Sequence, residues 1–399
     1  MRGNDFLDKM ELIDPAYVEA ADVKPSKRKN VWIKWGAMAA CMCLVVVGIL
    51  TIERQSAPNP PDFTNLELIM IPKLSVSGMG FEGYMYYDIS ELNNGNPWSE
   101  NMNITFLPVY KNGAYDSSGA GVPTGLSEAE MMERLSFAAS ALDLEVLSTE
   151  VIADEFTEKD DKMIPDTNPT EIHAETNNGT IYIQADGGIV YFLPDEGLTL
   201  PDEYHFTQSS TTDAEAKNVL SYLIDVYRNL LAFEKPETIS SGEYNIYGEF
   251  LRNYRVFDAS GNDVEDILNY NFRCVRFSLN DRGNLYAIAK GDGLILAEKL
   301  GDYPVITAEE ATERLTAGNY QTSVPVEFPG EEYIGKIELV YRTGRLEEIF
   351  LPYYRFYVLL PDAMNTGTNN GLKTYGAYYV PAISDEYIAN MPTYDGRFN

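Results

Sequence analysis

The chain has 399 residues, of which 45% are hydrophobic and 12% aromatic; this composition excludes a protein that is disordered throughout. The formal net charge is −31, and a surface this acidic repels nucleic acid and anionic lipid headgroups. The cysteines stand at 41, 43 and 274. Because the first two lie in an apolar segment, the last has no partner for an intramolecular disulfide, and a disulfide-stapled domain is excluded.

A short tail, residues 1–30, comes first, and its six basic and six acidic groups cancel. Apolar side chains recur in it at helical spacing and would share one face of a helix: Phe6, Met10, Ile13 and Tyr17. A segment this short cannot bury such a face by itself. Two interpretations stay open, a frayed or membrane-surface peptide and a docking helix for a cytosolic partner.

A transmembrane helix is predicted over residues 31–52. No residue from 36 to 52 is charged, and with the aromatic and apolar residues ahead of it the stretch reaches the roughly 20 residues that cross a bilayer core. Lys34 lies near one end, where its side chain can reach the interface. Four basic residues precede the span, whereas Glu53 and Arg54 after it cancel. The positive flank predicts a single-pass protein with its N-terminus in the cytoplasm and its C-terminal region outside the cell.

Three other interpretations of this apolar stretch are less favoured. A cleavable signal peptide would be shorter and end in a small-residue cleavage site, but the best candidate site precedes Pro58. A lipoprotein signal would have to end at Cys41, yet the apolar run continues past it. A buried core helix does not account for the basic flank.

Residues 53–64 form a predicted linker, because positions 55–62 read QSAPNPPD and proline-rich segments are stiff and extended. The tail is neutral and Lys34 adds one positive charge. Because the whole chain sums to −31, the region beyond the span carries about −32. Solubility alone accounts for such a charge, and recruitment of cations or basic partners is the alternative.

The exported region is predicted to be α+β, with helices packed on antiparallel sheets, in two domains over 65–205 and 206–399. Runs of alternating apolar and aromatic residues indicate strands: Leu66–Leu74, Tyr84–Ile89, Ile104–Tyr110, Ile181–Gln184, Ile189–Leu193, Tyr244–Phe250, Tyr254–Phe257, Phe272–Leu279, Leu285–Ala289, Ile337–Tyr341 and Tyr353–Leu360. Asn178-Gly179 is a typical hairpin turn. Three helices are predicted to open with capping boxes, formed by Ser127 with Glu130, Thr212 with Glu215 and Thr307 with Glu310.

The C-terminal segment from Ile306 onward, which reads ITAEEATERLTAGN and later YIGKIELVY and LPYYRFYVLLP, resembles the PepSY-like and YycI/YycH-like exported domains of Gram-positive bacteria. The resemblance implies a capped helix packed on an antiparallel sheet that is closed by the strand around Arg355. The N-terminal arrangement, with KPSKRK followed by WIKWGAMAAC, is similar to that of clostridial membrane-bound regulators, some of which resemble anti-sigma factors. This implies a non-enzymatic regulator that contacts a sensor kinase or a sigma factor. The zinc-binding His/Cys pattern of the best-known anti-sigma domain is missing.

Candidate chemistry is sparse, and the sequence predicts no catalytic residue, bound metal or cofactor. The two histidines, His173 and His205, have no ligand partners at metal-binding spacing. No nucleophile elbow or phosphate-binding glycine loop occurs. The acidic stretch 258–266 is similar to a calcium loop, but Asp263 stands where the glycine is expected and Asn269 where the bidentate glutamate is expected. A turn with an acidic rim is the favoured interpretation, and a weak external calcium site is the alternative.

A tyrosine cluster near the C-terminus is the strongest candidate for recognition. It comprises Tyr353, Tyr354, Phe356, Tyr357, Tyr375, Tyr378 and Tyr379. Strand alternation would bury half of these rings and expose the rest, and exposed tyrosines suit peptide, glycan or protein contacts. Core packing is the competing interpretation for most of them.

Two functions are therefore predicted. The first is a non-enzymatic membrane-anchored regulatory or sensory protein that acts outside the cell through protein–protein contacts. The second is a cell-surface binding module for cell-wall glycan or peptide, with the span as a passive tether. An exported hydrolase ranks third, because carboxylate pairs are common in so acidic a chain and carry little information.

Overall fold

The structure is a computed structural model, and it describes residues 66–72, 82–115, 125–153, 156–159, 162–165, 169–194, 197–204, 206–209, 211–280, 282–344, 346–361 and 371–396. The chain divides into two compact units, Met1–Asp62 and Phe63–Asn399. The predicted tail, the predicted span over 31–52 and the predicted linker all lie outside the described residues. Within the part described, no helix is long and apolar enough to cross a membrane.

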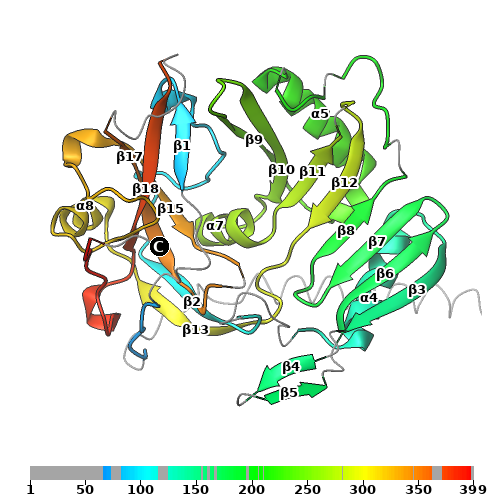
Figure 1. Cartoon of the computed structure of the whole chain (residues 1–399), viewed down its shortest axis with the longest axis horizontal. Helices are drawn as coiled ribbons and strands as arrows, with labels where there is room; N and C mark the ends of the chain where they lie inside the picture. Colours follow the sequence, from blue (N-terminus) through cyan, green and yellow to red (C-terminus); the bar gives the residue numbers. More distant parts are fainter. Residues whose placement is uncertain are drawn as a thin grey trace, which may run out of the picture. The chain divides into compact units, whose positions relative to one another are not determined.

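The described part of the chain is α+β, as predicted, with few helices on mostly antiparallel sheets (Figure 1). The largest sheet has eight strands in the order β3 (Val146–Ala153), β6 (Pro169–Thr176), β7 (Gly179–Gln184), β8 (Ile189–Phe192), β12 (Leu285–Lys290), β11 (Val275–Leu279), β10 (Phe250–Asp258) and β9 (Pro236–Tyr244). Strands β8 and β12 are neighbours in this sheet. The sheet therefore contains residues from both sides of position 205, where the sequence predicts a domain boundary.

Helices cover one face of the eight-stranded sheet, which we call its inner face. Helix α4 (Glu128–Ala141) packs on β6 to β8, and α5 (Asp213–Val226) packs on β9 and β10, followed by the short α6 (Arg228–Leu231). Alternate strand residues, such as Ile181 and Phe277, enter the core beneath these helices. Because burying an apolar side chain contributes about 1.5–3 kcal/mol, this alternation determines which face the helices cover.

A second sheet of five strands contains β1 (Gly83–Tyr86), β18 (Lys373–Pro381), β17 (Pro352–Leu359) and β15 (Ile334–Tyr341), with β14 (Gln321–Thr322) paired to β18. Helix α8 (Ala308–Thr316) packs against β18. A three-stranded sheet is formed by β13 (Ala297–Pro304), β2 (Phe106–Asn112) and β16 (Ile349–Phe350), and β4 (Phe156–Lys159) forms a hairpin with β5 (Lys162–Pro165). Among the described residues, 3₁₀ turns occur at Ile89–Glu91, Glu331–Tyr333 and Asp385–Tyr387.

Helix α7 (Asp263–Phe272) connects the two larger sheets (Figure 1). Ile267 and Phe272 belong to the core of the five-stranded sheet. Tyr270 packs with Ile239 and Phe257 on the outer face of the eight-stranded sheet, the face opposite α4 and α5. The helix thus has an apolar contact on each side.

Many local predictions are confirmed. All three predicted capping boxes are present, at α4, α5 and α8, and the turn at Asn178-Gly179 joins β6 to β7. Two strand predictions are wrong. Residues 245–249 form the turn between β9 and β10, with Tyr244 and Phe250 paired at its base, and the described residues of 66–74 make one isolated bridge from Ile69. Apolar content alone does not distinguish a hairpin tip from a strand.

Candidate functional site

The five tyrosines predicted for recognition, Tyr353, Tyr354, Tyr357, Tyr375 and Tyr378, are each less than 5% exposed. Strand alternation does send them to opposite faces, but both faces of the five-stranded sheet are covered. Tyr354 and Tyr378 belong to the core with α7 and α8, whereas Tyr353 belongs to the core with the segment around Ile69 and with β2. The premise that half of these rings would be exposed is therefore wrong, and core packing describes them.

The hydroxyl groups of these tyrosines are used inside the core. Tyr354 donates a hydrogen bond of 2.8 Å to the carbonyl of Ile306, and Tyr378 donates one of 2.7 Å to that of Val326. Burial raises the pKa of Tyr354 to about 12. A buried phenol needs such a partner, because an unpaired polar group is costly in an apolar interior.

The remaining predicted residues are placed as follows. Phe6, Met10, Ile13, Tyr17 and His205 lie outside the described residues. His173 pairs with Glu171, and its ring lies edge-on to Tyr182 with centroids 4.2 Å apart. Among the residues described, no three His, Cys, Asp or Glu side chains are gathered to hold a metal ion.

The acidic stretch 258–266 runs from the last residue of β10, Asp258, into the first turn of α7. Asn262 and Glu265 form a fourth capping box at the start of this helix. This box was not among the three predicted from the sequence. The carboxylate of Asp258 accepts hydrogen bonds from the backbone N–H groups of Glu234 and Lys235, at 3.1 and 2.8 Å. Asp266 accepts one from Gly261 at 3.1 Å. The prediction of a turn with an acidic rim therefore holds only for residues 259–262, because the chain is helical from Asp263 and the carboxylates of Asp258 and Asp266 accept hydrogen bonds from local backbone.

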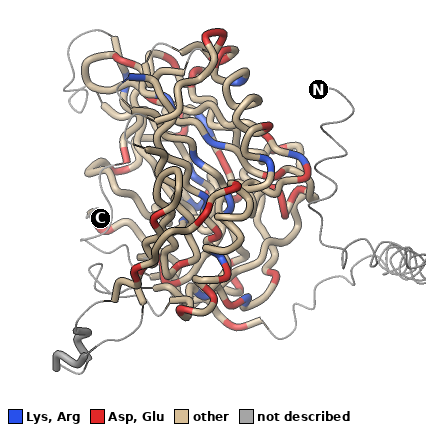
Figure 2. Tube along the Cα trace, turned by 90° about the vertical axis from the view of Figure 1, so that its right-hand side faces the viewer, with Lys and Arg blue, Asp and Glu red and all other residues tan. Residues whose placement is uncertain are grey.

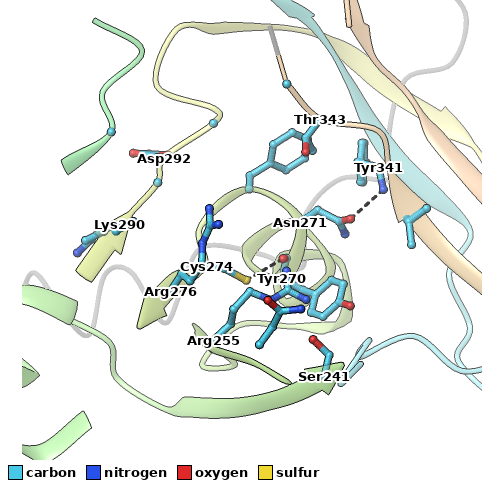
Figure 3. Close-up of a pocket in the computed structure, with 18 of the residues that line it drawn as sticks. Ser241, Arg255, Tyr270, Asn271, Cys274, Arg276, Lys290, Asp292, Tyr341 and Thr343 are labelled. Carbon is cyan, nitrogen blue, oxygen red and sulfur yellow. Dashed lines mark hydrogen bonds between the residues drawn. The ribbon is translucent and has the colours of Figure 1, made fainter. Parts of the chain in front are cut away.

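A cavity of about 810 Å³ lies between the outer face of the eight-stranded sheet, helix α7 and the five-stranded sheet (Figure 3). Strands β9, β10 and β11 contribute Ser241, Arg255 and Arg276, α7 contributes Tyr270, and β15 contributes Tyr341. These elements are distant in sequence. No single motif could therefore have indicated the site.

Arg255 and Arg276, which we call the arginine pair, are directly opposite each other on β10 and β11. Their sequence neighbours Tyr254, Val256 and Val275 enter the inner core. Since side chains alternate along a strand, both arginines are on the outer face, and Figure 3 shows them among the lining residues beside Cys274 and Tyr270. The available signal was an arginine between apolar neighbours in each strand, in YRVF at 254–257 and VRF at 275–277.

The arginine pair has no carboxylate partner within ion-pair distance among the described residues. Six other arginines do have one: Arg228, Arg252, Arg273, Arg314, Arg342 and Arg355. The buried Nε of Arg255 makes no hydrogen bond, and its guanidinium carbon lies 5.9 Å from the Tyr270 ring centre. Figure 2 shows acidic positions spread along the coloured part of the trace. Arg134 and Arg282 likewise have no ion pair among the described residues, so what distinguishes Arg255 and Arg276 is that they are cross-strand partners lining one cavity.

Cys274 also lines this cavity, but its thiol is not activated. It donates a 3.0 Å hydrogen bond to the carbonyl of Tyr270. Burial raises the pKa of the Cys274 thiol to about 11, although Arg255 acts in the opposite direction. Because the thiolate is the nucleophilic form, the protonated thiol behaves here as a small apolar side chain.

An ionic network lies behind the opposite wall of the cavity. Glu338 on β15 is 2% exposed; it pairs with Arg355 at 2.6 Å and with Lys336 at 2.8 Å. Asn94 and Tyr357 donate further hydrogen bonds to it, at 2.9 and 3.1 Å. Burial by itself would raise the pKa of the Glu338 carboxyl, but Arg355 and Lys336 outweigh burial and lower that pKa to about 2. Through the ion pairs and hydrogen bonds of Glu338, the network holds β15, β17 and the segment at Asn94 together.

A second cavity of about 750 Å³ shares Lys290 and Asp292 with the first. The Lys290 amine donates hydrogen bonds to the carbonyls of Leu230 and Leu231, at 2.8 and 2.7 Å, and lies over the ring of Phe233. Burial lowers the pKa of Lys290 to about 8. These contacts satisfy the carboxyl end of α6, so this lysine has a structural role.

A row of aromatic rings crosses the outer face of β6, β7, β8 and β12. His173, Tyr182, Phe192 and Tyr286 are successive neighbours, with ring centroids 4.2, 5.2 and 6.2 Å apart. Phe192 and Tyr286 are 37% and 38% exposed. We call this set the aromatic row; its members are isolated in sequence and become neighbours only through strand register.

The open cavity can bind a small molecule, because polar and cationic groups face its interior and α7 joins its two walls. Neither the comparison with known protein families nor the comparison with curated proteins finds a match for this chain. Its functional assignment therefore depends on the residues themselves.

Proposed function

We propose that this chain is a non-enzymatic, membrane-anchored regulatory or sensory protein, whose exported region binds a ligand and whose tail contacts a cytosolic partner. The observation that carries the proposal is the cavity between the two larger sheets, with lining residues from β9, β10, β11, α7 and β15. Pockets of roughly 300–1,000 Å³ with a few convergent polar groups are typical small-molecule sites. A ligand there would touch both sheets at once.

Such a position suits a sensor. A bound ligand stabilises the arrangement of elements that it contacts, and here that arrangement includes α7, which has apolar contacts on both sides. The uncharged stretch 36–52 and the basic flank before it support the anchor. The helical face of the tail supports a partner inside the cell, for which a sensor kinase or a sigma factor is the class implied by the N-terminal resemblance.

The test is affinity capture with the full chain and with a variant that lacks residues 1–22. We expect a cytosolic protein to be retained by the first and lost from the second, while circular dichroism of the two stays superimposable. A matched variant, Phe6→Ala with Ile13→Ala, should lose the same protein. An identical set of captured proteins with and without the tail would refute the regulatory proposal.

A surface binding module for cell-wall glycan or peptide is a second candidate, and the aromatic row supports it. Exposed rings on a rigid sheet offer apolar contact area together with polar edges. Binding to purified cell wall by the full chain should fall when Tyr182→Ala and Phe192→Ala are combined. Tyr247→Ala, in the turn between β9 and β10, is the control, since this ring is exposed but distant in register from the row.

A further inference from the structure

We infer that the arginine pair is a binding site for the oxyanion group of a small ligand, a phosphate or a carboxylate, inside the cavity between the two sheets. The inference rests on the proposed ligand-binding function and names the class of ligand. No part of it depends on the identity of the cytosolic partner.

The first support is geometric. Arg255 and Arg276 are direct cross-strand partners, and side chains at such positions start roughly 4.5–5.5 Å apart at their Cβ atoms. Both therefore reach the same volume of the cavity. Two guanidinium groups on one wall of a cavity can present several N–H donors to one oxyanion, and the fork of each group matches the geometry of phosphate and carboxylate oxygens.

The second support is electrostatic. Like charges placed directly opposite each other on neighbouring strands destabilise a sheet, and within the described residues neither member of the pair has a carboxylate at ion-pair distance. Arg355, which lines the same cavity, is neutralised by Glu338. An anion between Arg255 and Arg276 would remove the repulsion. It would also give the arginine pair a negative partner, as Glu338 does for Arg355 on the other wall.

The third support is an unused donor with polar neighbours. The Nε of Arg255 is buried and makes no hydrogen bond, and leaving a buried donor unpaired costs free energy. Ser241 and Asn253, which are paired with each other one step further along β9 and β10, also line the cavity. Their hydroxyl and amide groups are further donors on the same face as Arg255.

A purely structural role for the pair makes a different prediction. If Arg255 served only to contact Tyr270, and Arg276 only to keep the surface soluble, removing either charge would not affect anion binding. An anion site further predicts that, without the anion, Arg276→Gln leaves the thermal midpoint unchanged or raises it, because the repulsion is relieved. A structural role for Arg276 predicts a lower midpoint.

The experiment is equilibrium dialysis of the full-length chain against radiolabelled inorganic phosphate and, separately, radiolabelled citrate. We expect the unaltered chain to bind at least one of them, with Arg255→Gln and Arg276→Gln each weakening binding about tenfold or more and Arg282→Gln changing it less than about twofold. Arg282 is the matched control, because it is an exposed arginine next to the same strands and does not line the cavity.

Binding of phosphate alone, or of citrate alone, identifies the oxyanion group and supports the inference. It is overturned if the unaltered chain binds neither probe, if either arginine variant binds like the unaltered chain, or if Arg282→Gln weakens binding as much as the other two. The capture experiment with the tail is independent. If tail-dependent capture persists without anion binding, the anion site is wrong and the regulatory proposal stands.

Discussion

At the scale of single residues, buried charge is the most informative feature of this chain. Glu338 has two cationic partners and two hydrogen-bond donors around a fully buried carboxylate. In the part of the chain that the structure describes, the arginine pair has no carboxylate within ion-pair distance. The first arrangement is satisfied within the chain, whereas the second is the basis of the proposed anion site.

Glu338→Gln should destabilise the folded state by about 3–5 kcal/mol, because removing one member of a buried ion pair leaves the other buried and uncompensated. Urea unfolding monitored by circular dichroism measures this loss. Glu298→Gln, on an exposed position of β13, should change the free energy of unfolding by less than about 0.5 kcal/mol. Equal losses for the two variants would contradict the role assigned to the network.

Acid should remove the contribution of Glu338. Its pKa is lowered from 4.5 to about 2 in the folded state, so the folded state binds this proton less readily than the unfolded state. The stabilisation is therefore fully present above about pH 4.5 and is lost as the pH falls towards 2. Unfolding measured between pH 5 and 2 should show a smaller pH dependence for Glu338→Gln than for the unaltered chain. Parallel curves would refute this assignment.

At the scale of secondary-structure elements, local signals predict where elements begin and end. Four helices begin with a capping box in the structure. Three were predicted from Ser or Thr followed by Glu. The fourth begins at Asn262 and was not predicted, because the surrounding carboxylates favoured a turn with an acidic rim.

Asn262→Ala should destabilise the chain by about 1 kcal/mol, the typical cost of a lost N-cap. Asn262→Asp should restore most of this, because aspartate caps equally well and its charge is favourable at a helix N-terminus. Chemical denaturation of both variants gives the comparison. If the alanine and aspartate variants are equally unstable, the cap of α7 contributes nothing measurable.

Gly179 in the β6–β7 turn should be far less tolerant of substitution than Gly318. Both have positive φ, +95° and +83°, so alanine is strained by about 1–2 kcal/mol at either position. Only at Gly179 would the added Cβ also meet a backbone atom, 2.2 Å from the Phe192 carbonyl oxygen, whereas at Gly318 nothing lies within 4 Å. Thermal unfolding of Gly179→Ala and Gly318→Ala should show the larger loss for the first; equal losses would contradict it.

At the scale of the whole molecule, the eight-stranded sheet joins residues from both sides of position 205. The core beneath it includes Ile181 from one side and Phe277 from the other. We therefore expect a core substitution on one side of position 205 to destabilise strands on the other side as well.

Phe277→Ala should cost about 3–5 kcal/mol, the usual effect of removing a buried phenylalanine ring. It should lower the hydrogen-exchange protection of amides in β7 and β8 as well as in β10 and β12. Tyr247→Ala at the exposed turn should leave that protection unchanged. Loss of protection confined to β10 to β12 would show that residues 65–205 and 206–399 unfold independently, as separate domains.

The α+β class, the helix starts and several turns could be predicted from the sequence, because each depends on residues a few positions apart. Ser127 with Glu130 contains a complete cap, and Asn178-Gly179 suits a hairpin turn. Strand runs such as Tyr353–Leu360 were also correct to within a residue or two of β17. The membrane span over 31–52 stays a prediction of this local kind.

Only the tertiary structure decided which of these residues matter together. The tyrosine pattern correctly indicates a strand, but burial of both faces depends on what packs on each face, and that information is spread over the whole chain. Likewise Arg255 and Arg276 are unremarkable in sequence. They become a pair only through the register of β10 and β11, and face a cavity only because α7 holds the second sheet opposite them.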